Sequence, residues 1–168
     1  MDLFVYKVFV KMAEILLKSL KKNFISKKGR TSVLNGITYC FKQGQSYAIT
    51  GVSGTGKSTL MHIIAGIDEP SEGNIFFDKQ SLQKMTKAQK QLFLSKQISL
   101  VFQEPYLIAE LTILENAKTK AMIRRQSEKF FKEDLVILLK RVGLIDRQFN
   151  YPGQLSGGER QRLALVRA

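Results

Sequence analysis

GVSGTGKST, residues 51–59, is the stretch that decides the fold. It fits the phosphate-loop pattern G-x-x-x-x-G-K-[ST] at every fixed position. Its three glycines permit tight turns that point backbone N–H groups inward, and these groups form a cradle for phosphate oxygens with the positive end of the following helix. Lys57 places a charge near the β- and γ-phosphates, and the Ser58 hydroxyl is placed to hold Mg²⁺.

The residues on either side of this loop predict the context that the motif requires. SYAIT (46–50) is a short β-like run, and LMHIIAGI (60–67) is an apolar helical segment. Strand, loop and helix in this order are the arrangement in which the motif binds phosphate. A chance Gly/Ser turn with a lysine does not explain this context.

The composition is that of an ordinary globular domain. The chain has 168 residues, of which 44% are hydrophobic, and its single cysteine, Cys40, excludes an internal disulfide. No apolar run approaches the roughly 20 residues of a membrane span, and the first residues lack the features of a signal peptide. The net charge of +13 comes from scattered basic residues, which favours a solvated surface over a functional basic face.

Hydrophobic patterning predicts alternating strands and helices in one domain. We expect an N-terminal extension over 1–12, helical or frayed, and a helix from Thr86 as N-cap to Gln97. The first expected strand is 15–20, and Asn23 and Phe24 close it. A hairpin tip at 27–30 leads to the second strand, 33–41. Two more strands are expected at 74–78 and at 98–102, the latter a buried strand of the kind found in parallel sheets.

The remaining third of the chain is predicted to be mainly helical. Between residues 112 and 142 the apolar spacing indicates one buried helix face, which ends at a glycine C-cap, Gly143. The members of this face are Phe131, Leu135, Leu138 and Val142. The final segment, from Gly158 to Ala168, is predicted to be a helix.

A second motif precedes this last helix. Ser156 is placed as an N-cap, and Gly157 and Gly158 expose backbone N–H groups at the positive end of the helix, which makes a second anion site. A short S-G-G is weak evidence alone. Together with Leu155, Glu159 and the phosphate loop upstream it is strong evidence.

YPGQLSGGERQRLALVRA (151–168) resembles the signature segment of ATP-binding cassette (ABC) ATPases, and the phosphate loop resembles theirs. Gln103 matches the Q-loop glutamine, and Phe24 falls where that family has an aromatic residue that stacks on adenine. The resemblance covers about residues 13–168. FQEPYLIAELTILEN (102–116) and Glu159 look most like the lipoprotein-release and macrolide-export branch.

The resemblance implies an α/β fold, the P-loop NTPase fold of ABC type. It comprises an antiparallel β subdomain and a helical subdomain at about 104–155, and we expect it to be incomplete at the C-terminus. It implies ATP and Mg²⁺ as cofactors, a second ABC ATPase subunit in a head-to-tail dimer, and an integral membrane permease contacted by residues 104–116. No nucleic acid is expected. The implied location is the cytoplasmic face of the inner (plasma) membrane.

The family's binding residues carry over position by position. Phe24 would stack on the base, with a strand-end core residue as the alternative. Ser58 and Gln103 would reach Mg²⁺ and Gln103 would sense the γ-phosphate, unless it is an ordinary surface residue. The triphosphate loop comprises Gly51, Val52, Ser53, Gly54, Thr55, Gly56, Lys57, Ser58 and Thr59. The signature residues Ser156, Gly157, Gly158 and Glu159 would meet the γ-phosphate held by the opposite subunit.

The chain ends at Ala168, before the family's Walker B aspartate, catalytic glutamate, D-loop and switch histidine would appear. We therefore assign no catalytic residue, and expect weak ATP binding without turnover from this chain alone. His62 lies in the helix after the phosphate loop and is interpreted as a packing or surface residue, and Cys40 as inert core.

Three alternatives stay open at this point. A non-catalytic remnant or dimerisation module shares the ancestry without the activity, and the DNA after codon 168 would distinguish it. A DNA-repair relative would suit the charge, but such proteins place long coiled coils between the two motifs. A kinase or GTPase would explain the phosphate loop but not LSGGE.

Overall fold

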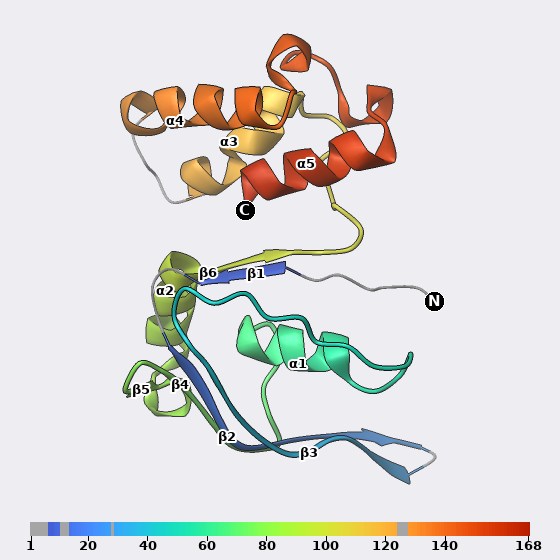
Figure 1. Ribbon diagram of the computed structural model, residues 1–168, viewed down its shortest axis with the longest axis vertical. Helices are drawn as coiled ribbons and strands as arrows, with labels where there is room; N and C mark the ends of the chain where they lie inside the picture. The colour runs from blue at the N-terminus through green and yellow to red at the C-terminus, as the bar shows by residue number, and fades with distance from the viewer. Residues whose placement is uncertain (1–6, 11–13, 28, 124–127) are drawn as a thin grey trace. The chain divides into compact units, whose positions relative to one another are not determined.

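The computed structural model describes residues 7–10, 14–27, 29–123 and 128–168, in two compact units that span 1–100 and 101–168 (Figure 1). Each unit is described by itself. In the described ranges, no helix combines the length and the apolar character needed to cross a membrane.

The first unit is built on an antiparallel sheet of order β3-β2-β4-β5. Its strands are β2 (Ile15–Ser26), β3 (Gly29–Phe41), β4 (Glu72–Phe77) and β5 (Gln80–Ser81). The predicted hairpin is confirmed, but two residues predicted to lie in its tip, Gly29 and Arg30, belong to β3 and pair with Ser26 and Ile25. The predicted end of the first strand is also wrong. Asn23 and Phe24 continue β2, because they pair with Ser32 and Thr31 of the partner strand.

One face of this sheet carries the core of the unit. Leu17, Leu20 and Ile75 are buried, and α1 (Lys57–Ile64) packs its Leu60, Ile63 and Ile64 into the same cluster (Figure 1). This core fixes the helix that follows the phosphate loop.

The other elements of the first unit are a short 3₁₀ turn, a helix and two strands. They are η1 (Leu82–Lys84), α2 (Lys87–Gln97), β6 (Ile98–Val101) and β1 (Lys7–Val10). Thr86 caps α2 as predicted, since its hydroxyl accepts from Gln89 N and Gln89 Oε1 accepts from Thr86 N. β1 pairs with β6 in a two-stranded sheet. The helical interpretation of the N-terminal extension is therefore wrong for residues 7–10, and residues 1–6 and 11–12 lie outside the described part.

The strand predicted before the phosphate loop is also wrong. Residues 46–50 carry no strand assignment, and no strand of the described chain pairs with them. An apolar run becomes a strand only when a neighbour supplies hydrogen-bond partners for its backbone. Tyr47 anchors this stretch in another way, because its hydroxyl accepts from Lys42 N at 2.8 Å and its ring packs edge-on against Phe41.

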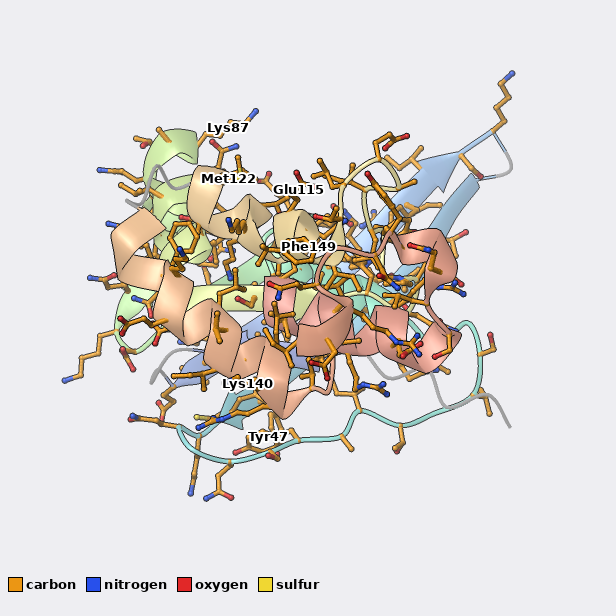
Figure 2. All side chains as sticks on the ribbon, turned by 90° about the horizontal axis from the view of Figure 1, so that it is seen from above. Tyr47, Lys87, Glu115, Met122, Lys140 and Phe149 are labelled. Atoms are coloured by element: carbon orange, nitrogen blue, oxygen red, sulfur yellow. The ribbon has the colours of Figure 1, made fainter. Side chains whose placement is uncertain are left out.

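The second unit is helical. It contains α3 (Ile113–Ile123), α4 (Glu128–Arg141) and α5 (Gly157–Arg167), with 3₁₀ turns η2 (Ile145–Arg147) and η3 (Pro152–Gln154). Its core contains Ile113, Leu139, Leu144 and Leu163, each fully buried. Lys140 lies in the last turn of α4, where its positive charge interacts favourably with the negative end of the helix dipole (Figure 2).

The buried face predicted for α4 is wrong at one position. Leu138 is 40% exposed, whereas Leu139 is fully buried beside Leu135. Both leucines fit a helical period after Leu135, at i+3 and i+4, so spacing alone did not separate them. Gly143 is the predicted C-cap: its φ is +68° and Leu144 N donates to Leu139 O.

Candidate nucleotide-binding site

The phosphate loop is open to solvent along its first five residues, 51–55. Gly51, Gly54 and Gly56 all have positive φ, the conformation that glycine adopts without strain. Gly56 is the N-cap of α1, so Lys57 is the first residue of the helix. The first N–H groups of an α-helix have no partner within the helix, so an anion that enters the open loop can accept hydrogen bonds from them.

Lys57 folds back over this loop. Its Nζ donates to Gly51 O at 2.9 Å and to Val52 O at 2.8 Å, while the Thr55 hydroxyl donates to Val52 O at 2.8 Å. Phosphate oxygens are better acceptors for an ammonium group than neutral carbonyls. The lysine is thus already in place at the loop mouth and would exchange carbonyl partners for a phosphate.

Close packing against β3 sets the position of the loop. A Cβ atom on Gly56 would lie 2.8 Å from Val33 Cγ1, 3.0 Å from Val33 O and 3.0 Å from Leu34 Cδ2. A Cβ on Gly54 would meet nothing within 4 Å. Gly56 is thus needed for its conformation and for its lack of a side chain, whereas Gly54 is needed for conformation alone.

The residues present fit a polyphosphate better than a metal ion by itself. Within α1, described throughout, the first turn has no acidic residue, so nothing there repels an anion. Among the described residues, no group of three or more His, Cys, Asp or Glu side chains could hold a metal. A half-buried Ser58 hydroxyl beside bound phosphates is instead the kind of oxygen ligand that Mg²⁺ accepts jointly with phosphate.

Phe24 lies on the hairpin of the same unit. Its side chain is 44% exposed, which removes the alternative that it is a strand-end core residue. The Nζ of Lys22 lies 4.9 Å from the centroid of its ring. An exposed ring supported by a cation provides a surface on which a planar base can stack.

The serine-glycine-glycine corner lies in the second unit and is exposed. Ser156 caps α5: its hydroxyl accepts from Glu159 N at 3.3 Å, and Glu159 Oε2 accepts from Ser156 N at 2.8 Å and from the Ser156 hydroxyl at 2.8 Å. The hydrogen bonds from the Ser156 backbone and hydroxyl lower the pKa of Glu159. Arg147 adds an ion pair to Glu159 at 3.2 Å.

Gln103 also lies in the second unit, exposed, just after β6. Two residues that sequence reasoning left without a role connect its segment to α5. Gln161 Nε2 donates to Phe102 O at 3.1 Å, and Arg167 donates to the carbonyls of Pro105 and Tyr106. Gln161 stood inside the quoted signature segment, but its partner, 59 positions away, left no signal in the sequence.

The structure thus groups the predicted residues in two sets. Phe24 and the loop 51–59 belong to the first unit, and Gln103 and 156–159 belong to the second. His62, in α1, is half-buried, as expected of a packing or surface residue. Cys40 is half-buried and lies outside the buried clusters, so its interpretation as a core residue is wrong. Burial, a hydrogen bond to Glu14 and the charge of Glu14 raise the pKa of the Cys40 thiol, which suits an unreactive cysteine.

Residues 34–168 match the family described as ABC transporter. The chain belongs to the ABC transporter family. It is 38% identical over 160 residues to the lipoprotein-releasing system ATP-binding protein LolD of Acinetobacter baylyi, covering 94% of this chain and 70% of that protein. It is 39% identical over 156 residues to LolD of Syntrophotalea carbinolica, covering 93% of this chain and 69% of that protein.

Solved structures give the same result. A dimeric structure of the bacterial ABC transporter cassette MJ0796 is 31% identical with a TM-score of 0.81, covering 91% of this chain and 68% of that one. CbiO1 of Clostridium perfringens, part of the transporter complex cbiONQ, is 26% identical with a TM-score of 0.76, covering 93% of this chain and 61% of that one. The expected family and cassette fold are confirmed, and the protein is an ABC transporter ATP-binding subunit. Of the expected lipoprotein-release and macrolide-export branch, the relatives named LolD bear out the lipoprotein-release part.

Proposed function

We propose that this ABC subunit couples ATP binding and hydrolysis to lipoprotein release at a membrane. The observation that carries the proposal is the open phosphate loop, seated on β3 through Gly56 with Lys57 at its mouth. The relatives named LolD supply the choice of process, because their names describe a lipoprotein-releasing system.

In this proposal the first unit holds the nucleotide. The loop 51–59 binds the triphosphate through its backbone N–H groups, and Lys57 neutralises the outer phosphates. Phe24 supports the base. As the family resemblance implies, we assign Ser58 and Gln103 as the residues that would hold Mg²⁺, which when bound would neutralise charge on the phosphates.

Partners complete the site. We place the signature residues 156–159 against the γ-phosphate bound by a second ABC subunit in a head-to-tail dimer; the exposed corner and the dimeric MJ0796 structures support this. Residues 104–116 contact an integral membrane permease, with the subunit peripheral at the cytoplasmic face of the inner membrane. Asn116 shapes that segment: it is fully buried and its amide bonds to Ile108, Leu111 and Thr112.

For the 168-residue chain alone we propose weak ATP binding without useful turnover. The described residues offer phosphate contacts, but we assign no group to activate a water molecule. A non-catalytic remnant or dimerisation module is the second candidate. Absence of nucleotide binding would favour it.

Calorimetric titration of the chain with Mg–ATP tests the proposal. Lys57→Ala should weaken binding by about tenfold or more, because a charge-assisted contact to phosphate is lost. Lys87→Ala, at the exposed start of α2, is the matched control and should leave affinity unchanged. No binding by the parent chain, or equal binding by Lys57→Ala, would refute the site. Phosphate release at ordinary enzyme rates, about 1 per second or faster, would refute the absence of turnover.

A further inference from the structure

Lys22 occupies an unusual position for a surface lysine. Its side chain is only 13% exposed, although it extends from a hairpin strand. Its Nζ donates to Asp68 Oδ1 at 2.6 Å and to Glu69 O at 2.8 Å, and it also lies 4.9 Å from the centroid of the Phe24 ring. One ammonium group therefore has an acid, a carbonyl and an aromatic ring as partners.

The acid and the carbonyl belong to the turn that follows α1. Asp68 N donates to His62 O in α1 at 3.3 Å, so the turn starts directly from the helix that carries Lys57. Further bonds join the same turn to β2: Ser71 N donates to Lys21 O at 2.8 Å and Asn23 N donates to the Ser71 hydroxyl at 3.0 Å. Lys22 thus ties the strand that carries Phe24 to the end of the phosphate-loop helix.

A cation near an aromatic ring has two physical effects. It attracts the π-electrons of the ring, and it limits the orientations that the ring can adopt. An exposed phenylalanine without such support would lose more rotamer freedom when a base stacks on it. Since the Lys22 ammonium is itself fixed by Asp68 and Glu69, the ring is held before any ligand arrives.

We propose that Lys22 is a positioning residue for Phe24 and thereby sets how much the base of a purine nucleoside triphosphate contributes to affinity, a role that rests on the proposed function. Phosphate binding at Lys57 does not need it. Lys22 therefore acts on the base-dependent part of binding and leaves the phosphate-dependent part unchanged.

Two ligands separate these parts: Mg–ATP and Mg–tripolyphosphate, which has phosphates and no base. Lys22→Gln removes the charge but keeps an amide that can donate to Asp68 and Glu69. It should weaken ATP binding by about three- to tenfold and change tripolyphosphate binding by less than about twofold. Lys22→Arg keeps a cation beside the ring and should restore ATP affinity.

Two further variants serve as controls. Lys21→Gln removes the neighbouring lysine, which is 46% exposed and pairs with Glu72 rather than with the ring, and should leave both ligands unaffected. In a Phe24→Leu background, Lys22→Gln should have no additional effect on ATP, because the ring through which it acts is gone.

The outcomes distinguish this proposal from the nucleotide site itself. If the parent chain binds neither ligand, or if Lys57→Ala binds both as well as the parent does, the proposed function fails. If that site stands and Lys22→Gln weakens both ligands equally or neither, or if Lys22→Arg does not restore ATP binding, the role of Lys22 is overturned. Should Lys22→Gln unfold, Asp68→Asn loosens Lys22 in place, and the same selective loss of ATP binding is expected; an equal loss for both ligands would overturn the proposal.

Discussion

Arg167 holds the backbone at Tyr106. Its Nη1 lies 2.6 Å from Tyr106 O and its Nη2 lies 2.5 Å from Pro105 O. Tyr106 has a φ of +43°, a left-handed conformation that strains a residue with a side chain unless its surroundings fix it. The last turn of α5 thus fixes the segment that follows Gln103, and burial lowers the pKa of the guanidinium that does so.

Arg167→Lys should loosen this segment. A lysine offers one compact donor group where the guanidinium forks between two carbonyls, so at least one charge-assisted bond is lost. We expect a loss of about 1–2 kcal/mol in the free energy of unfolding and faster amide exchange over 106–108. Arg162→Lys, in the same helix but bonded to Val142 O, is the control. Equal exchange in the two variants would contradict the assignment.

Gly56→Ala should destabilise the protein more than Gly54→Ala. Both positions have positive φ, which costs about 1–2 kcal/mol for an alanine. At Gly56 the new methyl also meets Val33 at 2.8 Å, and overpacking adds about 1–3 kcal/mol. Urea denaturation of the two variants measures the difference. An equal loss in the free energy of unfolding for both variants would show that β3 shifts to accommodate the extra methyl group at residue 56.

The parts that sequence predicted well depend on local chemistry. The caps at Thr86, Ser156 and Gly143 and the glycine geometry of the loop were readable because each is set by residues within a few positions. The same holds for the hairpin, whose second strand begins at Gly29 with a φ of +116°.

The parts that sequence missed depend on distant partners. Residues 46–50 have the pattern of a strand without a hydrogen-bonded neighbour, and residues 7–10 became β1 because β6 pairs with them. The links from Gln161 to Phe102 and from Lys22 to Asp68 span 59 and 46 positions. No periodicity or spacing rule predicts such side-chain contacts.

Asn116→Ala should be strongly destabilising. The buried amide accepts from Ile108 N and donates to the carbonyls of Ile108, Leu111 and Thr112, so its loss removes four hydrogen bonds from the segment that leads into α3. We expect a loss of about 2–4 kcal/mol in the free energy of unfolding. Glu110→Ala, exposed on the same segment, is the control. A loss under about 1 kcal/mol would mean that water replaces the amide.

The lowered pKa of Asp68 predicts that the stability of the protein depends on pH. Burial raises its pKa, but the hydrogen bonds from Lys22 and from Glu69 N, with the charge of Lys22, outweigh this, so the pKa in the folded state is lowered. A carboxyl group whose pKa is lower in the folded state than in the unfolded state stabilises the folded protein. This contribution is fully present at a pH above the unfolded-state pKa, about 3.9, and is lost as the pH falls through the folded-state pKa.

Asp68→Asn should therefore be less stable than the parent at pH 7, and the gap should close below about pH 4. We expect a difference of about 1 kcal/mol in the free energy of unfolding at pH 7, because the Asp68 side chain is 33% exposed and solvent weakens its ion pair with Lys22. Urea midpoints at constant ionic strength between pH 3 and pH 7 measure the gap. Asp134→Asn, on the exposed side of α4, should show none. A gap that stays constant down to pH 3, or widens there, would contradict a native-state carboxylate held by Lys22.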